Sequence, residues 1–191
     1  MAARTLRCTI EEVADWYPQL FLDPYIVACV ATMSRYSSSP ASFKVNCEGI
    51  DSRWLAGAEE FRLQVSWTEA TAEKAERLRA TMPSKEVVEL ASVALAFALA
   101  RRVLGLRQLV VTNRGEGADY RAPSASRVLE ISGTETMAEL GRRHREKVAQ
   151  ALRNPFGWDA YVIVCGFATP EHRIRISANA WEESTHAEDE G

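Results

Sequence analysis

One helix-forming segment constrains this fold more than any other. Residues 84–104 read SKEVVELASVALAFALARRVL, and apolar side chains fall on nearly every side of a helix with this sequence. We therefore expect a helix that the rest of the domain surrounds. Its most apolar part, residues 90–100, spans eleven residues before Arg101 and Arg102. That length is well short of the roughly 20 residues that cross a bilayer, so we expect no membrane span.

The segments before this helix predict an N-terminal α+β subdomain. Asp23 followed by Pro24 is typical of a helix start, and the run FRLQVSWT at 61–68 alternates apolar and polar residues as a half-buried strand does. A Met-Pro-Ser sequence at 82–84 marks the end of the subdomain. Within it we expect helices over 25–35 and 69–79 and strands over 43–47 and 61–68.

The segments after the helix predict a mixed α/β core. A capping box at Thr136 and Glu139 predicts the start of a second helix, which ends before Pro155. His144 lies in the apolar stripe of that helix, so we interpret it as a satisfied core histidine. The core thus has the order helix, three strands, helix, strand, followed by a last strand. We expect these strands over 107–112, 118–121, 127–132, 161–167 and 173–177.

The chain as a whole divides into three parts. We expect the subdomain over 1–80, the core over 81–180 and a disordered acidic tail over 181–191, which has five acidic residues and no apolar period. With 47% hydrophobic and 26% charged residues, the composition is that of a globular protein. Four scattered cysteines and three separated histidines argue against a zinc site or a disulfide framework, so we expect a cytoplasmic protein.

Basic residues concentrate in the middle of the chain. Residues 101–153 carry 11 basic and 6 acidic groups, although the net charge of the chain is −3. Such a block favours a polyanion as partner, whereas the alternative is that arginines on exposed helix faces only keep the protein in solution. The arginines that we predict to contact nucleic acid are Arg114, Arg121, Arg142, Arg143 and Arg145.

The stretch GADYRAPSASRVLEISGT at 117–134 predicts a hairpin that brings two acids together. With its turn centred on residues 124–125, Asp119 falls directly opposite Glu130. The twofold period of a strand puts Glu130 and Ser132 on one face. Like charges in directly opposed positions destabilise the pair, and a cation such as Mg²⁺ removes that cost. The alternative is a solvated hairpin edge, or an ion pair with Arg114, Arg121 or Arg127.

Residues 84–180 resemble the restriction-endonuclease-like fold of the PD-(D/E)xK nucleases. Asp119 stands at the family's aspartate, the sequence LEISGT at 129–134 is similar to its glutamate-x-lysine strand, and Glu89 matches a glutamate that many members carry on the first helix. The resemblance implies a metal-dependent phosphodiesterase acting on DNA or RNA. It also implies that Mg²⁺ or Mn²⁺ is held by Asp119 and Glu130, with Glu89 as a further ligand.

Ser132 departs from the family's pattern, because it stands where the motif has a lysine. A serine hydroxyl supplies neither positive charge nor a useful base at neutral pH. Lys147 is the only lysine on the second helix, but it lies eleven residues after Thr136, about 16 Å along the axis, so we expect it to lie far from the strand end. Arg143 starts nearer, yet arginine cannot act as a base.

Two functions follow from these patterns. The first is a nuclease, in a bacterial defence system for example, with Asp119, Glu130 and Lys147 as its catalytic residues. The second is a catalytically degenerate module that binds nucleic acid or a protein partner within a larger complex. In that case residues 1–80 are the docking surface, and a homodimer is a further possibility.

Overall fold

The computed structural model describes residues 4–113, 118–168 and 171–181. Within these ranges the chain is a mixed α/β protein with five α-helices and one eight-stranded sheet. The helices are α1 (Glu12–Trp16), α2 (Asp23–Met33), α3 (Glu69–Thr81), α4 (Ser84–Arg102) and α5 (Met137–Ala151). The strands are β1 (Thr5–Thr9), β2 (Ala41–Glu48), β3 (Glu60–Ser66), β4 (Val110–Val111), β5 (Tyr120–Ala122), β6 (Arg127–Thr134), β7 (Asp159–Gly166) and β8 (His172–Asn179).

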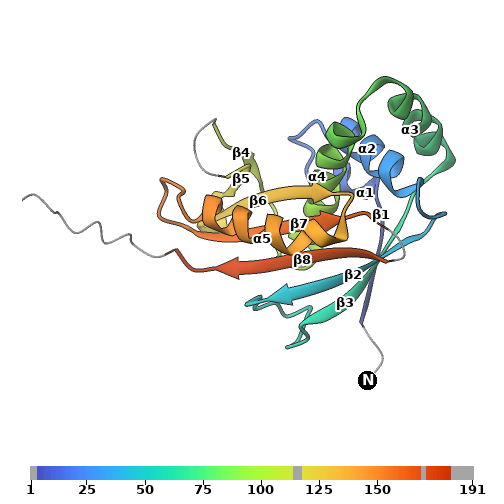
Figure 1. Cartoon of the computed structure of the whole chain (residues 1–191). Coiled ribbons are helices and arrows are strands. Elements are labelled where there is room, and N and C mark those ends of the chain that lie inside the picture. Colours follow the sequence, from blue (N-terminus) through green and yellow to red (C-terminus); the bar gives the residue numbers. More distant parts are fainter. Residues whose placement is uncertain (1–3, 114–117, 169–170, 182–191) are drawn as a thin grey trace, which may run out of the picture.

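The strands form one mixed sheet in the order β1-β3-β2-β8-β7-β6-β5-β4 (Figure 1). β6 and β7 run parallel and are joined through α5, whereas β4, β5 and β6 are antiparallel neighbours. The strands of residues 1–80 continue the same sheet, because β2 pairs in parallel with β8. The division into a subdomain over 1–80 and a core over 81–180 stays a prediction.

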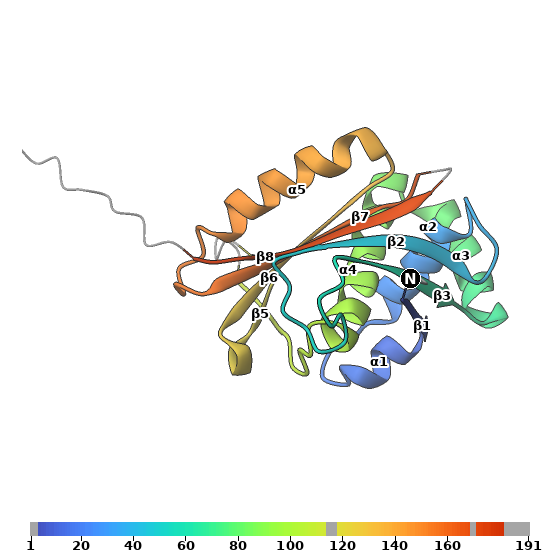
Figure 2. The same cartoon turned by 90° about the horizontal axis from the view of Figure 1, so that it is seen from below.

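Helices cover the sheet on both faces (Figure 2). α5 packs on β6, β7 and β8, while α4 packs on the other face of β6 and β7 and also contacts α2. Along β6, Leu129 and Ile131 belong to the hydrophobic cluster around α4, whereas Val128 packs with Leu140 of α5. The predicted alternation of β6 is therefore confirmed. Each of its faces is buried, and any polar side chain on β6 lies between the sheet and a helix.

The helix α4 is the centre of the larger cluster, as its sequence predicts. Every residue of α4 from 87 to 100 is buried except Glu89, Leu90 and Val93. The helix ends as expected, with Gly105 in a left-handed conformation (φ +72°) and the Leu106 N–H donating to the Ala100 carbonyl at 2.8 Å. In the described part of the chain, no helix combines the length and the apolar character of a membrane span.

Three expectations about secondary structure need correction. The strand β1 and the helix α1 are absent from the predicted order, because five residues are too few to give a clear period. The capping box is wrong: the Thr136 side chain caps nothing, and the Thr134 hydroxyl instead accepts from the Thr136 N–H at 3.0 Å and contacts Glu139 at 3.2 Å. β4 keeps only two residues of the strand expected over 107–112. Most of the predicted disordered tail, residues 182–191, lies outside the described residues.

A glycine lets α4 approach β6 closely. A Cβ atom on Gly133 would lie 2.2 Å from the Ser92 hydroxyl oxygen and 2.7 Å from the Val88 carbonyl oxygen of α4. Any larger side chain at residue 133 must therefore push the helix away from the sheet. This close contact holds the Glu89 turn of α4 against the carboxyl end of β6.

We predict that Gly133→Ala lowers the free energy of unfolding by about 1–3 kcal/mol, because the added methyl group overpacks the contact with the α4 backbone. Urea denaturation measures the change. Gly141→Ala is the matched control, since its Cβ would meet nothing closer than 3.7 Å. There the loss of a helical glycine is expected to raise stability by up to about 1 kcal/mol. Equal stability of Gly133→Ala and the wild type would contradict the close approach.

Candidate functional site

The candidate site lies where the β5–β6 ladder stops. The predicted hairpin register is confirmed by the pairs Tyr120–Leu129 and Ala122–Arg127. At Asp119 the pattern changes, because its N–H donates to the Leu129 carbonyl at 3.2 Å instead of pairing with Glu130. The expected direct opposition of the two acids is therefore wrong. Asp119 leaves the ladder, and its side chain turns back onto the edge of β6.

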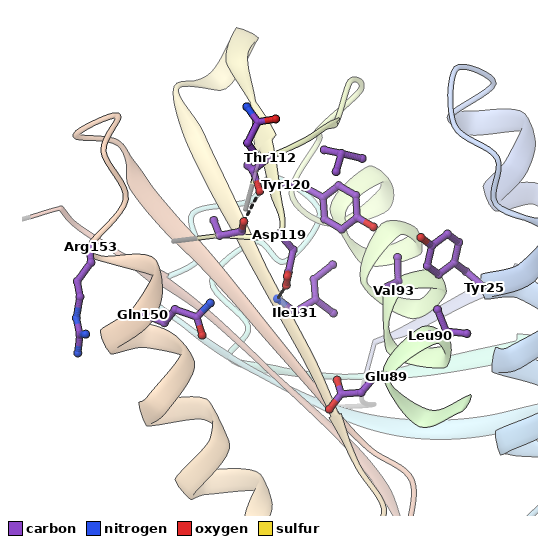
Figure 3. A pocket seen from close by; sticks show the side chains of 13 residues that line it. Tyr25, Glu89, Leu90, Val93, Thr112, Asp119, Tyr120, Ile131, Gln150 and Arg153 are labelled. Atoms are coloured by element: carbon purple, nitrogen blue, oxygen red, sulfur yellow. Dashed lines mark hydrogen bonds between the residues drawn. The ribbon is translucent and has the colours of Figure 1, made fainter. Parts of the chain in front are cut away.

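Beyond Leu129, side-chain carboxylates accept the hydrogen bonds of the β6 backbone N–H groups that no strand pairs with. The Ile131 N–H donates to Asp119 Oδ2 at 2.8 Å (Figure 3), and the Gly133 N–H donates to Glu89 Oε2 at 3.1 Å. In an ordinary ladder these donors pair with a neighbouring strand, and buried donors need a partner. Two acids from different elements are thus placed along one strand edge by the backbone itself.

Glu130 lies on the face of β6 that meets α5. Its side chain is 0% exposed and its Oε1 forms an ion pair with Lys147. Its other oxygen, Oε2, is buried and has no hydrogen-bond partner among the described residues. A buried carboxylate oxygen without a donor is costly, so this atom is an open position for a proton or a cation.

Lys147 reaches Glu130, so the expectation that it lies too far away is wrong. The error has a geometric reason. α5 turns back over the strand that precedes it, so distance along the helix brings a side chain back toward the hairpin. The roughly 16 Å from Thr136 to Lys147 correspond to about five residues of strand, which leads from the start of the helix to Glu130.

Arg143 occupies the neighbourhood of Ser132, where the resemblance expects a lysine. Its guanidinium donates to the Ser132 hydroxyl at 3.4 Å and pairs with Glu89 at 3.1 Å and Glu139 at 3.2 Å. α5 therefore places two cations over β6, with Arg143 beside Ser132 and Lys147 beside Glu130. Glu89, the expected third metal ligand, is already held by Arg143 and by the backbone.

Burial makes the two central acids weak. It raises the pKa of Glu130 from 4.5 to about 7, and the nearby charge of Asp119 adds to the effect, while Lys147 opposes it. Burial also raises the pKa of Asp119, although the Ile131 N–H and Lys147 lower it. The charge of Glu89 raises the pKa of Asp119 further, and the charge of Asp119 in turn acts on Glu130, so the three acids are electrostatic neighbours. At neutral pH such a pair favours an added proton or a divalent cation.

The residues fit a two-carboxylate metal site better than a larger cluster. Among the described residues, no group of three or more histidine, cysteine or acidic side chains is arranged to hold a metal. Mg²⁺ is commonly held by one or two carboxylates and keeps its remaining positions for water and phosphate oxygens. Asp119 and the open Oε2 of Glu130 provide such a pair.

The arginines predicted to bind nucleic acid do not share one surface. Arg121 lies over the ring of Phe156, 5.5 Å from its centre, and Arg142 pairs with Glu146 at 2.7 Å. Arg145 is exposed, and Arg114 lies outside the described residues. Among the four of these arginines that the structure describes, only Arg143 contacts one of the acids of the site. His144 is a satisfied core residue as expected, because its Nε2 lies 2.9 Å from the Ser177 hydroxyl.

A cavity of about 720 Å³ opens beside Asp119 (Figure 3). The three residues of α4 between 87 and 100 that are not buried, Glu89, Leu90 and Val93, all line it. The sequence analysis did not find this cavity, because its walls come from α2, α4, α5 and the strands β4 to β6. No local pattern connects such distant segments. The other lining residues are Tyr25, Val111, Thr112, Asn113, Ala118, Tyr120, Ile131, Gln150 and Arg153.

A comparison of the chain with known protein families, with curated proteins and with solved structures finds no match.

We predict that Glu130 makes the protein less stable as the pH rises from about 4.5 to about 7. In this window the unfolded chain releases the proton of Glu130 while the folded chain still binds it, so the folded state loses free energy relative to the unfolded state. Above about 7 both states are ionised and the difference stays constant. The fall should be smaller in Glu130→Gln by up to about 3 kcal/mol, since one pKa unit corresponds to about 1.4 kcal/mol.

Urea denaturation with a chelator, from about pH 5 to about pH 8, measures this difference. Glu86→Gln is the control, because Glu86 is an exposed glutamate in the first turn of α4 and lines no part of the site. It should keep the pH dependence of the wild type. A Glu130→Gln curve parallel to the wild-type curve would contradict the buried, weakly acidic state of Glu130.

Proposed function

We propose that this chain is a metal-dependent phosphodiesterase that cleaves DNA or RNA. The observation that carries the proposal is the contact between Lys147 and Glu130 beside Asp119. It brings together two acids and a lysine, which is the set of side chains that the PD-(D/E)xK resemblance requires. In this proposal Lys147 takes the place of the lysine that is replaced by Ser132.

The order of the elements supports a restriction-endonuclease-like core. α4 is followed by the antiparallel strands β4, β5 and β6, then by α5 and by β7, which is parallel to β6. This is the order of helix, three strands, helix and strand on which the resemblance rests. Asp119 directly precedes the second of these strands and Glu130 lies on the third, as in the family's motif.

The chain's own residues then have distinct roles. Asp119 and Glu130 would hold Mg²⁺ or Mn²⁺, which supplies an activated water and offsets charge on the scissile phosphate. Lys147 holds Glu130 in place and provides an ammonium group that can orient the water or neutralise a phosphate oxygen. Arg143 adds a fixed positive charge two strand residues further along, at Ser132. Glu89 orients Arg143 from the opposite side.

One observation favours the second candidate, a degenerate module that binds without cutting. Lys147 and Arg143 already pair with Glu130 and Glu89, so the acids are neutralised in part by the protein's own cations. A module of this kind needs no metal. Activity with a divalent cation separates the two candidates.

We predict that the protein nicks supercoiled plasmid in the presence of Mg²⁺ or Mn²⁺ and that Asp119→Asn abolishes nicking. Lys147→Met should lower the rate by about 10²–10⁴-fold, the usual contribution of a positioned proton-transfer group. Lys74→Met is the matched control, because Lys74 is an exposed lysine of α3 that pairs with Asp23 away from the site. It should cut at the wild-type rate. Gel electrophoresis of the plasmid forms over time gives the rates.

Two outcomes would change the assignment. If Lys147→Met cuts as fast as the wild type, Lys147 is not the replacement for the missing lysine. If the wild type and all variants are equally inert with either metal, the binding module replaces the nuclease as the proposed function.

A further inference from the structure

The cavity beside Asp119 has one apolar and one polar side. Leu90 and Val93 of α4 and Ile131 of β6 form the apolar side, and Tyr25 of α2 extends it (Figure 3). Tyr25 is half-buried, so part of its ring remains open to the cavity. Its hydroxyl lies close to that of Tyr120, whose pKa is raised first by burial and then by this neighbour. An aromatic ring held in this way is a fixed, flat contact surface.

The opposite side of the cavity is formed by the end of α5. Gln150 and Arg153 lie there, across β6 from Tyr25 (Figure 3). The Gln150 side chain accepts from the Lys147 ammonium at 3.1 Å, so this wall is continuous with the candidate site. Arg153, two residues after α5, is exposed and forms no ion pair with any described residue, unlike Arg142 and Arg143 within the helix. A cation of this kind is available to a phosphate group.

The size and chemistry of the cavity fit an unpaired nucleotide. A volume of about 720 Å³ lies within the range of about 300–1,000 Å³ typical of pockets for small organic ligands. A duplex keeps its bases stacked and shows only their edges in its grooves. A single strand offers base faces, which proteins bind by stacking on aromatic side chains. Tyr25 provides the ring for such stacking, and Arg153 provides the charge for the backbone.

We propose that this cavity binds one nucleotide of a single-stranded DNA or RNA, with its base against Tyr25 and its phosphate at Arg153. The choice of nucleic acid as ligand rests on the proposed function. The nucleotide's backbone then passes Asp119 and Lys147, so the substrate of the phosphodiesterase is a single strand or a locally unpaired region. Relaxed duplex is a poor substrate because its bases cannot enter the cavity, whereas negative supercoiling favours locally unpaired regions in a plasmid.

The experiment measures binding without cleavage, by fluorescence anisotropy of labelled oligonucleotides in EDTA. A single strand of about 12 nucleotides, as DNA and as RNA, is compared with the matching duplex. We expect at least one single strand to bind about ten-fold or more tightly than the duplex. The DNA and RNA arms identify the sugar that the protein prefers.

Two variants test the two contacts. Tyr25→Leu should weaken single-strand binding by about ten-fold, within the range of stacking losses per base, while Tyr25→Phe keeps the affinity. Arg153→Gln should lower the slope of log affinity against log salt by about 0.7, the value for one phosphate contact on a single strand. Arg77→Gln, the same change at an exposed arginine of α3, should alter neither quantity.

The proposal is overturned if the duplex binds as well as the single strands, if no oligonucleotide binds, or if Tyr25→Leu and Arg153→Gln both bind like the wild type. Circular dichroism spectra of the variants confirm that each is folded. Because EDTA removes metal-dependent cleavage, a chain that binds single strands but never cuts would refute the nuclease and leave this inference standing. A chain that cuts plasmid but fails the binding test would refute this inference and leave the nuclease standing.

Discussion

The candidate site depends on the early end of one ladder of hydrogen bonds. β5 pairs with β6 only as far as Tyr120 and Leu129, so the next backbone donors on that edge of β6, at residues 131 and 133, have no strand beside them. Asp119 and Glu89 accept from these donors. Because the backbone requires an acceptor at each position, it fixes two carboxylates along a buried edge. Acids in such a place need positive charge nearby, and α5 supplies it.

The two cations of α5 fit this edge because the spacings of helix and strand agree. Arg143 and Lys147 are one helical turn apart, a rise of about 6 Å. Ser132 and Glu130 are two strand residues apart, about 6.6 Å. Since α5 runs back along β6, the order of the contacts is reversed, and Arg143 meets Ser132 while Lys147 meets Glu130. On the other face, Gly133 lets α4 come close enough for Glu89 to reach the same edge.

Local patterns in the sequence predict the parts of this structure that local interactions determine. The buried helix at 84–102, the hairpin register from Tyr120 to Arg127 and the apolar stripe with His144 follow from hydrophobic periodicity and turn position. The reach of Lys147 does not, because it depends on the direction in which α5 crosses the sheet. Local sequence patterns do not predict the cavity, since packing between segments more than a hundred residues apart brings Tyr25 and Arg153 to opposite walls of it.

The energetics of the Lys147 contact favour a catalytic site over a purely structural pair. A fully buried carboxylate and its partner lose hydration that their attraction only partly restores, so apolar residues of similar size stabilise a fold at least as well. Glu130 adds a further cost, because one of its oxygens has no partner and a second acid lies beside it. Unfavourable arrangements of this kind are typical of functional sites, and here the cost falls on the acids that a phosphodiesterase requires.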